Sequence, residues 1–97
     1  MVSKNYISGI VRISEEPECL ILDDNIYFTT CIAESEQLDS IHLNFWGDLA
    51  YYVFESYQTD DYILIEGYIS LNENEMPIDT IESKEFILTV LETYLIY

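Results

Sequence analysis

The stretch from Ile41 to Leu71 constrains the fold most, because its hydrophobic period changes twice. Apolar and polar residues alternate over 41–46, which predicts a strand with one face in a core. Over 48–58 the apolar residues recur at helical spacing, which predicts an amphipathic helix. Alternation returns over 62–69, so a second strand is expected there. The chain is therefore expected to contain a strand, a helix and a strand in direct succession.

The junction between the first of these strands and the helix carries the only tryptophan of the chain. Trp46 follows His42 and Asn44 on the polar side of its strand, so its ring is expected to face outward. Gly47 breaks the strand, and Asp48 stands where a helix N-cap is expected. The predicted apolar stripe of the helix consists of Leu49, Ala50, Val53, Phe54 and Tyr57.

The first and last strands of the chain are predicted by the same alternation. Residues 5–14 form the first strand, in which Gly9 indicates a bulge or a coil, and 15–18 form a loop. A turn is expected over 72–77 and the last strand over 85–94. Both faces of this last strand are apolar, so we expect it to be fully covered or to meet another subunit.

A hairpin is expected between the first strand and the central unit. Its strands cover 19–22 and 26–33, its turn is Asp-Asp-Asn at 23–25, and a polar loop over 34–40 follows. In its second strand we expect Ile26, Phe28, Thr30 and Ile32 to be buried and Tyr27, Thr29 and Cys31 to be exposed.

With 19–22 counted together with the first strand, five strands with one helix between the third and the fourth have the order of an OB-fold barrel. At 97 residues, of which 49% are hydrophobic, the chain is expected to form a single domain over 1–97. The predicted fold class is therefore all-β with one helix, as a five-stranded OB-fold barrel. Its predicted core consists of Ile7, Val11, Ile13, Phe28, Ile32, Leu43, Phe45, Leu49, Val53, Ile63, Ile65, Ile69 and Val90.

Three segments resemble the single-stranded DNA-binding protein (SSB) family. The family's aromatic-Gly-x-Leu-Ala pattern is similar to FWGDLA at 45–50, and its strand with Glu-Gly near the middle is similar to 62–69. Its Asp-Pro-Glu turn is similar to Glu-Pro-Glu at 16–18. Length and tyrosine-rich composition also resemble the small SSB-like reading frames of plastid and cyanobacterial genomes. Over residues 4–94 the resemblance implies an OB fold, single-stranded DNA binding and assembly into homodimers or tetramers.

The resemblance also implies a role for Trp46, because the family's aromatic before Gly-x-Leu-Ala stacks on bases. Stacking on an aromatic side chain is worth about 1–3 kcal/mol per base. Tyr6, Tyr27 and Tyr68 are expected on the outward faces of the first, second and fourth strands, where they would form an aromatic row with Trp46. The alternatives are a tryptophan half-covered by the helix, and tyrosines that serve protein contacts.

The charge of the chain opposes DNA binding. Lys4, Arg12 and Lys84 are the only Lys and Arg residues against 19 acidic residues, and the net charge is −16. Binding of single-stranded DNA normally uses a positive groove along the backbone. Arg12 and Lys84 are included in the predicted binding site as its cations. The alternative function is an acidic interaction module that mimics nucleic acid and docks on a basic replication or transcription protein.

Other functional classes are not expected. His42 has no serine or cysteine motif around it, and no carboxylates form a spaced pair in an apolar setting, so the chain is predicted not to be an enzyme. The turn at 23–25 lacks the Asp-x-Asp-x-Asp-Gly pattern of calcium loops, and neither a metal nor a cofactor is expected. Cys19 and Cys31 match no metal or redox spacing and are predicted to be free, partly buried thiols.

The sequence also carries expectations about location. No apolar run approaches the roughly 18–20 residues of a transmembrane helix, so no membrane partner is expected. Residues 1–5 resemble neither a signal peptide nor a transit peptide. Many isoleucines and nine tyrosines indicate an AT-rich coding genome. Together with the resemblance, these features predict a protein of the plastid stroma or of a cyanobacterium-like cytoplasm.

Overall fold

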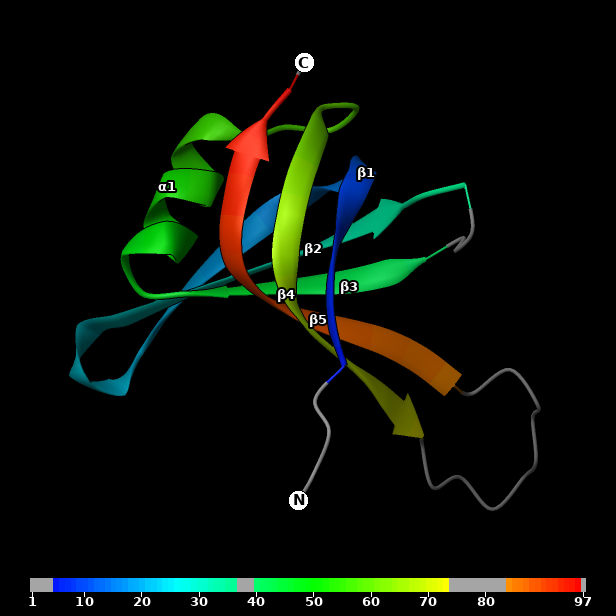
Figure 1. Cartoon of the computed structure of the whole chain (residues 1–97). Coiled ribbons are helices and arrows are strands. Elements are labelled where there is room, and N and C mark those ends of the chain that lie inside the picture. Colours follow the sequence, from blue (N-terminus) through cyan, green and yellow to red (C-terminus); the bar gives the residue numbers. More distant parts are fainter. Residues whose placement is uncertain (1–4, 37–39, 74–83, 97) are drawn as a thin grey trace.

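The computed structural model describes residues 5–36, 40–73 and 84–96, which form one closed β-barrel with a helix (Figure 1). The elements are β1 (Tyr6–Leu22), a short 3-10 helix η1 (Asp23–Asn25), β2 (Ile26–Glu34), β3 (Ile41–Trp46), α1 (Asp48–Ser56), β4 (Tyr62–Glu73) and β5 (Lys84–Leu95). The strands close in the order β1-β2-β3-β5-β4. All neighbouring pairs are antiparallel except β3 and β5, which are parallel. This is the OB-fold barrel, and the predicted fold class is confirmed.

β1 is one continuous strand, although the sequence pattern predicts two strands and a loop. Its first half, Tyr6–Arg12, pairs with β4, and its second half pairs with β2. The register against β2 shifts twice between Ile13 and Glu18. These irregularities accommodate Pro17 inside the strand, because a bulged residue makes no ladder hydrogen bond. The predicted loop over 15–18 is therefore wrong.

β2 turns the opposite face to the core from the one that was expected. Thr29, Cys31 and Ala33 are buried, whereas Phe28 and Ile32 lie on the outer face and are only half-buried, so their predicted core positions are wrong. The reason is volume, because the inward residues stand opposite Phe45, Leu43 and Ile41 of β3. Small inward side chains leave space for these large ones. The hydroxyl of Thr29 donates a hydrogen bond of 2.7 Å to the Ala50 carbonyl oxygen, which satisfies it inside the core.

Gly47, not the predicted Asp48, is the N-cap of α1. Its φ is 70°, a conformation that disfavours side chains with a Cβ. The helix ends earlier than predicted and packs against β1, β2 and β3, with Ala50 and Val53 buried. Its predicted stripe is wrong at Phe54, whose side chain is 45% exposed. A helix that buries only a narrow stripe leaves the residue beside it in solvent.

Two strand glycines have different surroundings. The register between β1 and β4 runs past Gly9 without a shift, so the bulge predicted there is wrong. An added Cβ at Gly9 would meet no atom within 4 Å. Gly67 lies at a register shift between β4 and β5, and an added Cβ there would collide with the backbone of Thr89. Close approach of the two strands therefore requires glycine at position 67.

β4 and β5 are both longer than predicted and pair over their whole length. The predicted turn over 72–77 begins inside β4, and its remainder lies outside the described residues. One face of β5 buries Leu88 and Val90, while Leu91 on the other face is 48% exposed. The two-sided apolar character of β5 thus reflects one core face and one outer face.

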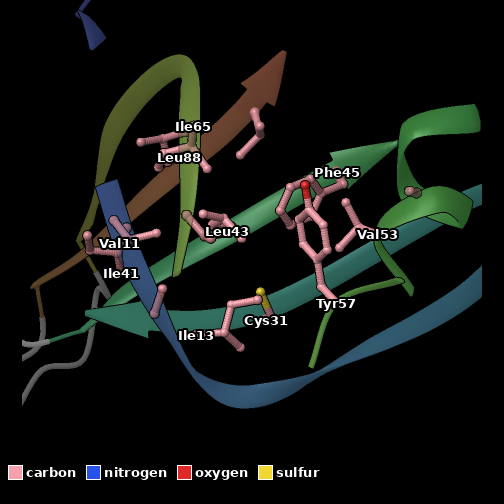
Figure 2. Packing of buried hydrophobic residues seen from close by; sticks show 14 residues of the cluster. Val11, Ile13, Cys31, Ile41, Leu43, Phe45, Val53, Tyr57, Ile65 and Leu88 are labelled. Carbon is pink, nitrogen blue, oxygen red and sulfur yellow. The ribbon is translucent and has the colours of Figure 1, made fainter. Parts of the chain in front are cut away.

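The barrel encloses a single core cluster (Figure 2). Eight predicted core residues are confirmed as buried: Val11, Ile13, Leu43, Phe45, Val53, Ile63, Ile65 and Val90. Three more, Ile7, Leu49 and Ile69, are partly buried and pack against the cluster. Six residues outside that predicted list are also buried, namely Cys31, Ala33, Ile41, Ala50, Tyr57 and Leu88. Of these, Ala50 and Tyr57 belong to the predicted apolar stripe of the helix, and Ile41 lies on the predicted core face of its strand. Tyr57 reaches the core with its hydroxyl 3.2 Å from the Thr93 hydroxyl, so its polar end is paired.

Candidate nucleic-acid interface

Trp46 ends β3 on the outer surface of the barrel, as predicted, and its side chain is 48% exposed. Phe28 lies directly opposite it on β2, and the two ring centroids are 4.5 Å apart at an interplanar angle of 49°. The strand end is held because the Gly47 amide donates a hydrogen bond of 2.9 Å to the Tyr27 carbonyl oxygen. Trp46 is therefore an exposed ring backed by a second aromatic ring.

Phe28 is the site residue that the sequence analysis missed. Its register partner on β1 is Leu20, which is 54% exposed, so Leu20, Phe28 and Trp46 form one row across three strands. This row can be predicted from the sequence once β2 is paired with β3. Large residues at 41, 43 and 45 require small partners, and that requirement directs Phe28 outward.

A second aromatic pair, Tyr6 and Tyr68, bridges β1 and β4 on the outer surface. The two residues are register partners, their ring centroids are 5.3 Å apart, and the rings are T-shaped. Their exposed fractions are 50% and 37%. The Tyr6 hydroxyl donates a hydrogen bond of 2.9 Å to Glu66 Oε1, and this bond, with burial and the nearby carboxylates, raises the pKa of Tyr6. Tyr6 thus stays a neutral ring at physiological pH.

Both pairs belong to one curved surface. Thr89 of β5 is a register partner of Tyr68 on one side and of Asn44 on the other, and Trp46 lies on the same face of β3 as Asn44. Tyr68 and Asn44 are thus two strand spacings apart, roughly 10 Å. This separation allows one extended strand of nucleotides to contact both pairs. The predicted grouping of Tyr6, Tyr68 and Trp46 on one outer surface agrees with this geometry.

Tyr27 is not part of this surface, and its predicted outward orientation is wrong. It lies on the same face of β2 as the buried Thr29 and packs half-buried against the core. Its ring centroid is 5.2 Å from that of Tyr51 in α1. The reversed face of β2 is the cause, because Tyr27 lies on the side covered by the helix. The structure therefore separates Tyr27 from Trp46.

Arg12, one of the two predicted cations, does not join the aromatic pairs. Arg12 forms an ion pair with Glu34 and another with Asp60 at 2.6 Å. It lies beside Glu34 at the far end of β2 from Phe28, roughly 20 Å along the strand. The side chain of Lys84, at the start of β5, lies outside the described part of the structure. Among the side chains that are described, Arg12 is the only Lys or Arg, and two carboxylates neutralise it.

The groups that the site can use for binding are aromatic rings, which can stack, and hydroxyl groups, which can form hydrogen bonds. In the described ranges, no cluster of three His, Cys, Asp or Glu side chains is placed to hold a metal ion.

Both cysteines are free thiols, as predicted, and burial raises the pKa of Cys31 to about 12. Such a thiol stays protonated and unreactive near neutral pH. Over the same ranges, no helix is both long and apolar enough to span a membrane.

Comparisons with known proteins agree with this architecture. No protein-family model matches the chain. A curated protein of Trieres chinensis, named "Putative single-stranded DNA-binding protein ycf41", is 29% identical over 87 residues, covering 77% of each chain. In sequence and fold, the chain is therefore SSB-like.

Solved structures of SSB proteins have the same fold. The SSB domain of a Synechococcus sp. protein superposes with a TM-score of 0.76 at 17% identity, covering 97% of this chain and 98% of that one. The second single-stranded DNA-binding protein of Mycobacterium smegmatis has a TM-score of 0.77 at 18% identity, covering 95% of this chain and 86% of that one. That of Thermus aquaticus has a TM-score of 0.69 at 13% identity, covering 96% of this chain and 50% of that one.

Proposed function

We propose that this SSB-like OB-fold protein binds single-stranded DNA by stacking bases on two aromatic pairs, Phe28 with Trp46 and Tyr6 with Tyr68. The observation that carries the proposal is the ring of Trp46, half exposed and held 4.5 Å from the Phe28 ring. It stands at the position of the family's stacking aromatic in FWGDLA. The named function of the Trieres chinensis relative supports the same conclusion.

The proposed mechanism is binding without catalysis. Each base places its flat face on an exposed ring, and this contact tolerates any sequence because every base has a π-face. The backing ring fixes the platform, so little side-chain entropy is lost on binding. Tyr27 and Arg12 are left out of the proposed site, since the first faces the helix and the second is held by carboxylates. Lys84 stays a predicted cation.

The acidic surface gives this binding an unusual dependence on salt. Proteins that bind single-stranded DNA usually lose affinity with a slope of about −0.7 per neutralised phosphate in log K against log salt. Here the described site supplies no Lys or Arg without a carboxylate partner, so few counterions are released. Salt instead screens repulsion between DNA and a chain of net charge −16. The expected slope is near zero or positive.

Titration of fluorescein-labelled oligo-thymidine, followed by anisotropy, tests the proposal. The wild-type protein should saturate with a Kd in the micromolar range, and Trp46→Ala should weaken binding by about tenfold or more, equivalent to the 1–3 kcal/mol of one stacked base. The labelled DNA carries the signal because this variant removes the only tryptophan. Phe54→Ala is the matched control, since it removes an exposed ring from α1 on another part of the surface.

Two results would contradict the proposal. Equal losses in Trp46→Ala and Phe54→Ala would mean that the stacking position has no special role. Absence of binding up to about a millimolar protein, beyond usual nonspecific affinities, would exclude DNA as the ligand. The acidic module that docks on a basic replication or transcription protein would then be the remaining function.

We further propose that the chain assembles into a homodimer or a tetramer through the outer surface at the end of β5. Leu91 and Tyr94 are 48% and 56% exposed there, and Ile10 at 55% lies two strands away in the same row as Tyr94. An apolar surface of this kind marks an interaction site. Assembly brings together copies of charge −16, so it should strengthen as salt rises.

Sedimentation at several salt concentrations measures this assembly. At tens of micromolar protein the average mass should rise with salt towards a dimer or tetramer. Tyr94→Glu should shift the protein towards monomer, because it places a charge in the apolar surface. Phe54→Glu, an equivalent change on α1, should leave the mass unaffected. A wild-type monomer at high salt would refute the proposal.

The proposed location is the plastid stroma or a cyanobacterium-like cytoplasm. Similarity to the ycf41 product of Trieres chinensis and to the SSB domain from Synechococcus sp. supports it. Mapping the gene provides the check. A nuclear gene that encodes a cleaved N-terminal extension would contradict the proposal.

A further inference from the structure

The outer side of α1 carries aromatic rings where a surface helix usually carries polar residues. Tyr51, Tyr52 and Phe54 are 48%, 49% and 45% exposed. Figure 1 shows the helix on the outside of the barrel, and its inner side packs against β1, β2 and β3. These rings belong neither to the two aromatic pairs nor to the apolar surface at the end of β5. Neither stacking on DNA nor the proposed assembly therefore uses them.

Two of these exposed rings are held in place by a second ring. The centroid of the Tyr51 ring is 5.2 Å from that of the half-buried Tyr27. The centroid of the Tyr52 ring is 5.7 Å from that of the buried Tyr57, in a T-shaped arrangement. A side chain that is already fixed loses little entropy when a ligand binds. Tyr51 and Tyr52 thus present fixed surfaces to a partner.

Exposed carboxylates lie next to both tyrosines. Asp48 precedes Tyr51 and Tyr52 by three and four positions, and Glu55 follows them by four and three. Residues at these spacings are neighbours on the surface of a helix. Each ring therefore has a carboxylate on either side along the helix. We refer to Asp48, Tyr51, Tyr52 and Glu55 as the helix patch.

Glu55 occupies a position where a helix favours a cation. It lies in the last turn of α1, where the free carbonyl groups give the helix end a partial negative charge. No basic residue lies in that turn, and in the described part of the chain neither Asp48 nor Glu55 forms an ion pair. A cation supplied by another molecule would therefore offset the negative charge at this end of the helix.

The combination of rings and carboxylates favours arginine as the ligand. A guanidinium group can lie flat on an aromatic ring and also donate two parallel hydrogen bonds to a carboxylate, whereas a lysine ammonium is a strongly hydrated point charge. Phosphates of DNA would be repelled by Asp48 and Glu55. A second copy of the chain fits poorly too, because its one arginine, Arg12, is already paired with two carboxylates.

We propose that the helix patch binds an arginine-rich segment of a partner protein. One arginine of the segment stacks on the Tyr52 ring and pairs with Glu55, and a second stacks on the Tyr51 ring and pairs with Asp48. Aromatic residues and arginine are the residue types enriched at protein interfaces. This interaction uses neither aromatic pair of the DNA-binding surface, so it does not depend on DNA binding.

Fluorescein-labelled hexa-arginine and hexa-lysine are the probes, because the two peptides carry the same charge. At low salt the net charge of −16 attracts both. Fluorescence anisotropy should show that hexa-arginine binds at least about threefold more tightly than hexa-lysine. In NMR spectra of the protein, hexa-arginine should shift the amide signals of residues 48–56 more than those of the other residues.

Tyr52→Leu and Glu55→Gln test the two components of the helix patch. The first removes the ring but keeps an apolar side chain, and the second removes the charge but keeps the shape. Each should weaken hexa-arginine binding by about two- to fivefold. Neither should unfold the protein, because both side chains are exposed and leucine and glutamine favour helices.

Each variant has a matched control. Glu36→Gln removes the same charge from an exposed position beyond the far end of β2 from Tyr27. Tyr94→Leu removes an exposed ring from β5. At low salt, both controls should leave the affinity for hexa-arginine nearly unchanged.

Three outcomes would overturn the proposal. Equal affinities for hexa-arginine and hexa-lysine would show that net charge alone attracts the peptides. Amide shifts centred outside residues 48–56 would place the binding site on another part of the protein. Losses in Tyr52→Leu and Glu55→Gln no larger than those in the two controls would show that the helix patch has no part in binding.

Discussion

Gly67→Ala is expected to lower the free energy of unfolding by about 3 kcal/mol, a large part of the stability of a small domain. The added Cβ would lie 2.9 Å from the Cα of Val90 and closer still to the Thr89 carbonyl oxygen. Both atoms belong to the backbone of β5, so rotation of a side chain cannot relieve the collision. Equilibrium unfolding in urea, followed by circular dichroism, measures the loss.

Gly9→Ala is the matched control for this change. It introduces the same methyl group into the neighbouring strand, where no atom lies within 4 Å. Stability should stay the same or rise by about 0.4–1 kcal/mol, because alanine restricts the unfolded chain. Similar losses in both variants would show that the clash with β5 is not the cause.

Ile65→Ala is expected to cost about 2–5 kcal/mol, the range for removing a large aliphatic side chain from a packed core. Ile65 is 1% exposed, and Figure 2 shows it beside Leu88 within the core cluster. The truncation removes buried surface and leaves a cavity that the closed barrel cannot readily collapse. The shift of the urea midpoint, at unchanged slope, measures the effect.

Ile10→Ala, measured at low salt where the proposed assembly is weakest, provides the comparison, because this isoleucine is 55% exposed on the outer face of β1. Its removal should change the free energy of unfolding by no more than about 0.5 kcal/mol. If Ile10→Ala proved as costly as Ile65→Ala, the assignment of inner and outer faces along β1 and β4 would be incorrect.

The central unit of β3, α1 and β4 could be predicted because its periods are unambiguous. On β3, Ile41, Leu43 and Phe45 alternate with polar residues, and Gly47 separates that strand from the helix. Each of these hydrophobic periods is consistent with only one type of element, either a strand or a helix. The register shift at Gly67 was not predictable, because a glycine in a strand indicates a bulge or a close approach without telling which. Gly9 shows the ambiguity, since the glycine at that position produces neither a bulge nor a close approach of two strands.

β2 could not be oriented from its own residues. Its two faces, with Phe28 and Ile32 on one and Cys31 and Ala33 on the other, are both apolar enough for a core. Hydrophobicity favours the first face, but the space left by Phe45 of β3 admits only the second. Packing between β2 and β3 decides which face of β2 points into the core. The sequence indicates that face only once the pairing of the two strands is known.

The predictions for the candidate site were right or wrong for similar reasons. The outward position of Trp46 followed from strict alternation in β3, and that prediction is confirmed. Phe28 was missed and Tyr27 misplaced for one reason, the reversed face of β2. The pairing of Arg12 with Glu34 and Asp60 joins segments far apart in the chain, so sequence spacing could not reveal it.

The division of β1 between two partners has a consequence for synthesis on the ribosome. Its second half pairs with β2, the next strand to emerge, so this hairpin can form early. Its first half must wait for β4, since Tyr6 pairs with Tyr68. Contacts of such long sequence separation form late and slowly. During translation the N-terminal half of β1 therefore remains exposed on both edges, and barrel closure is postponed until most of the chain has left the exit tunnel.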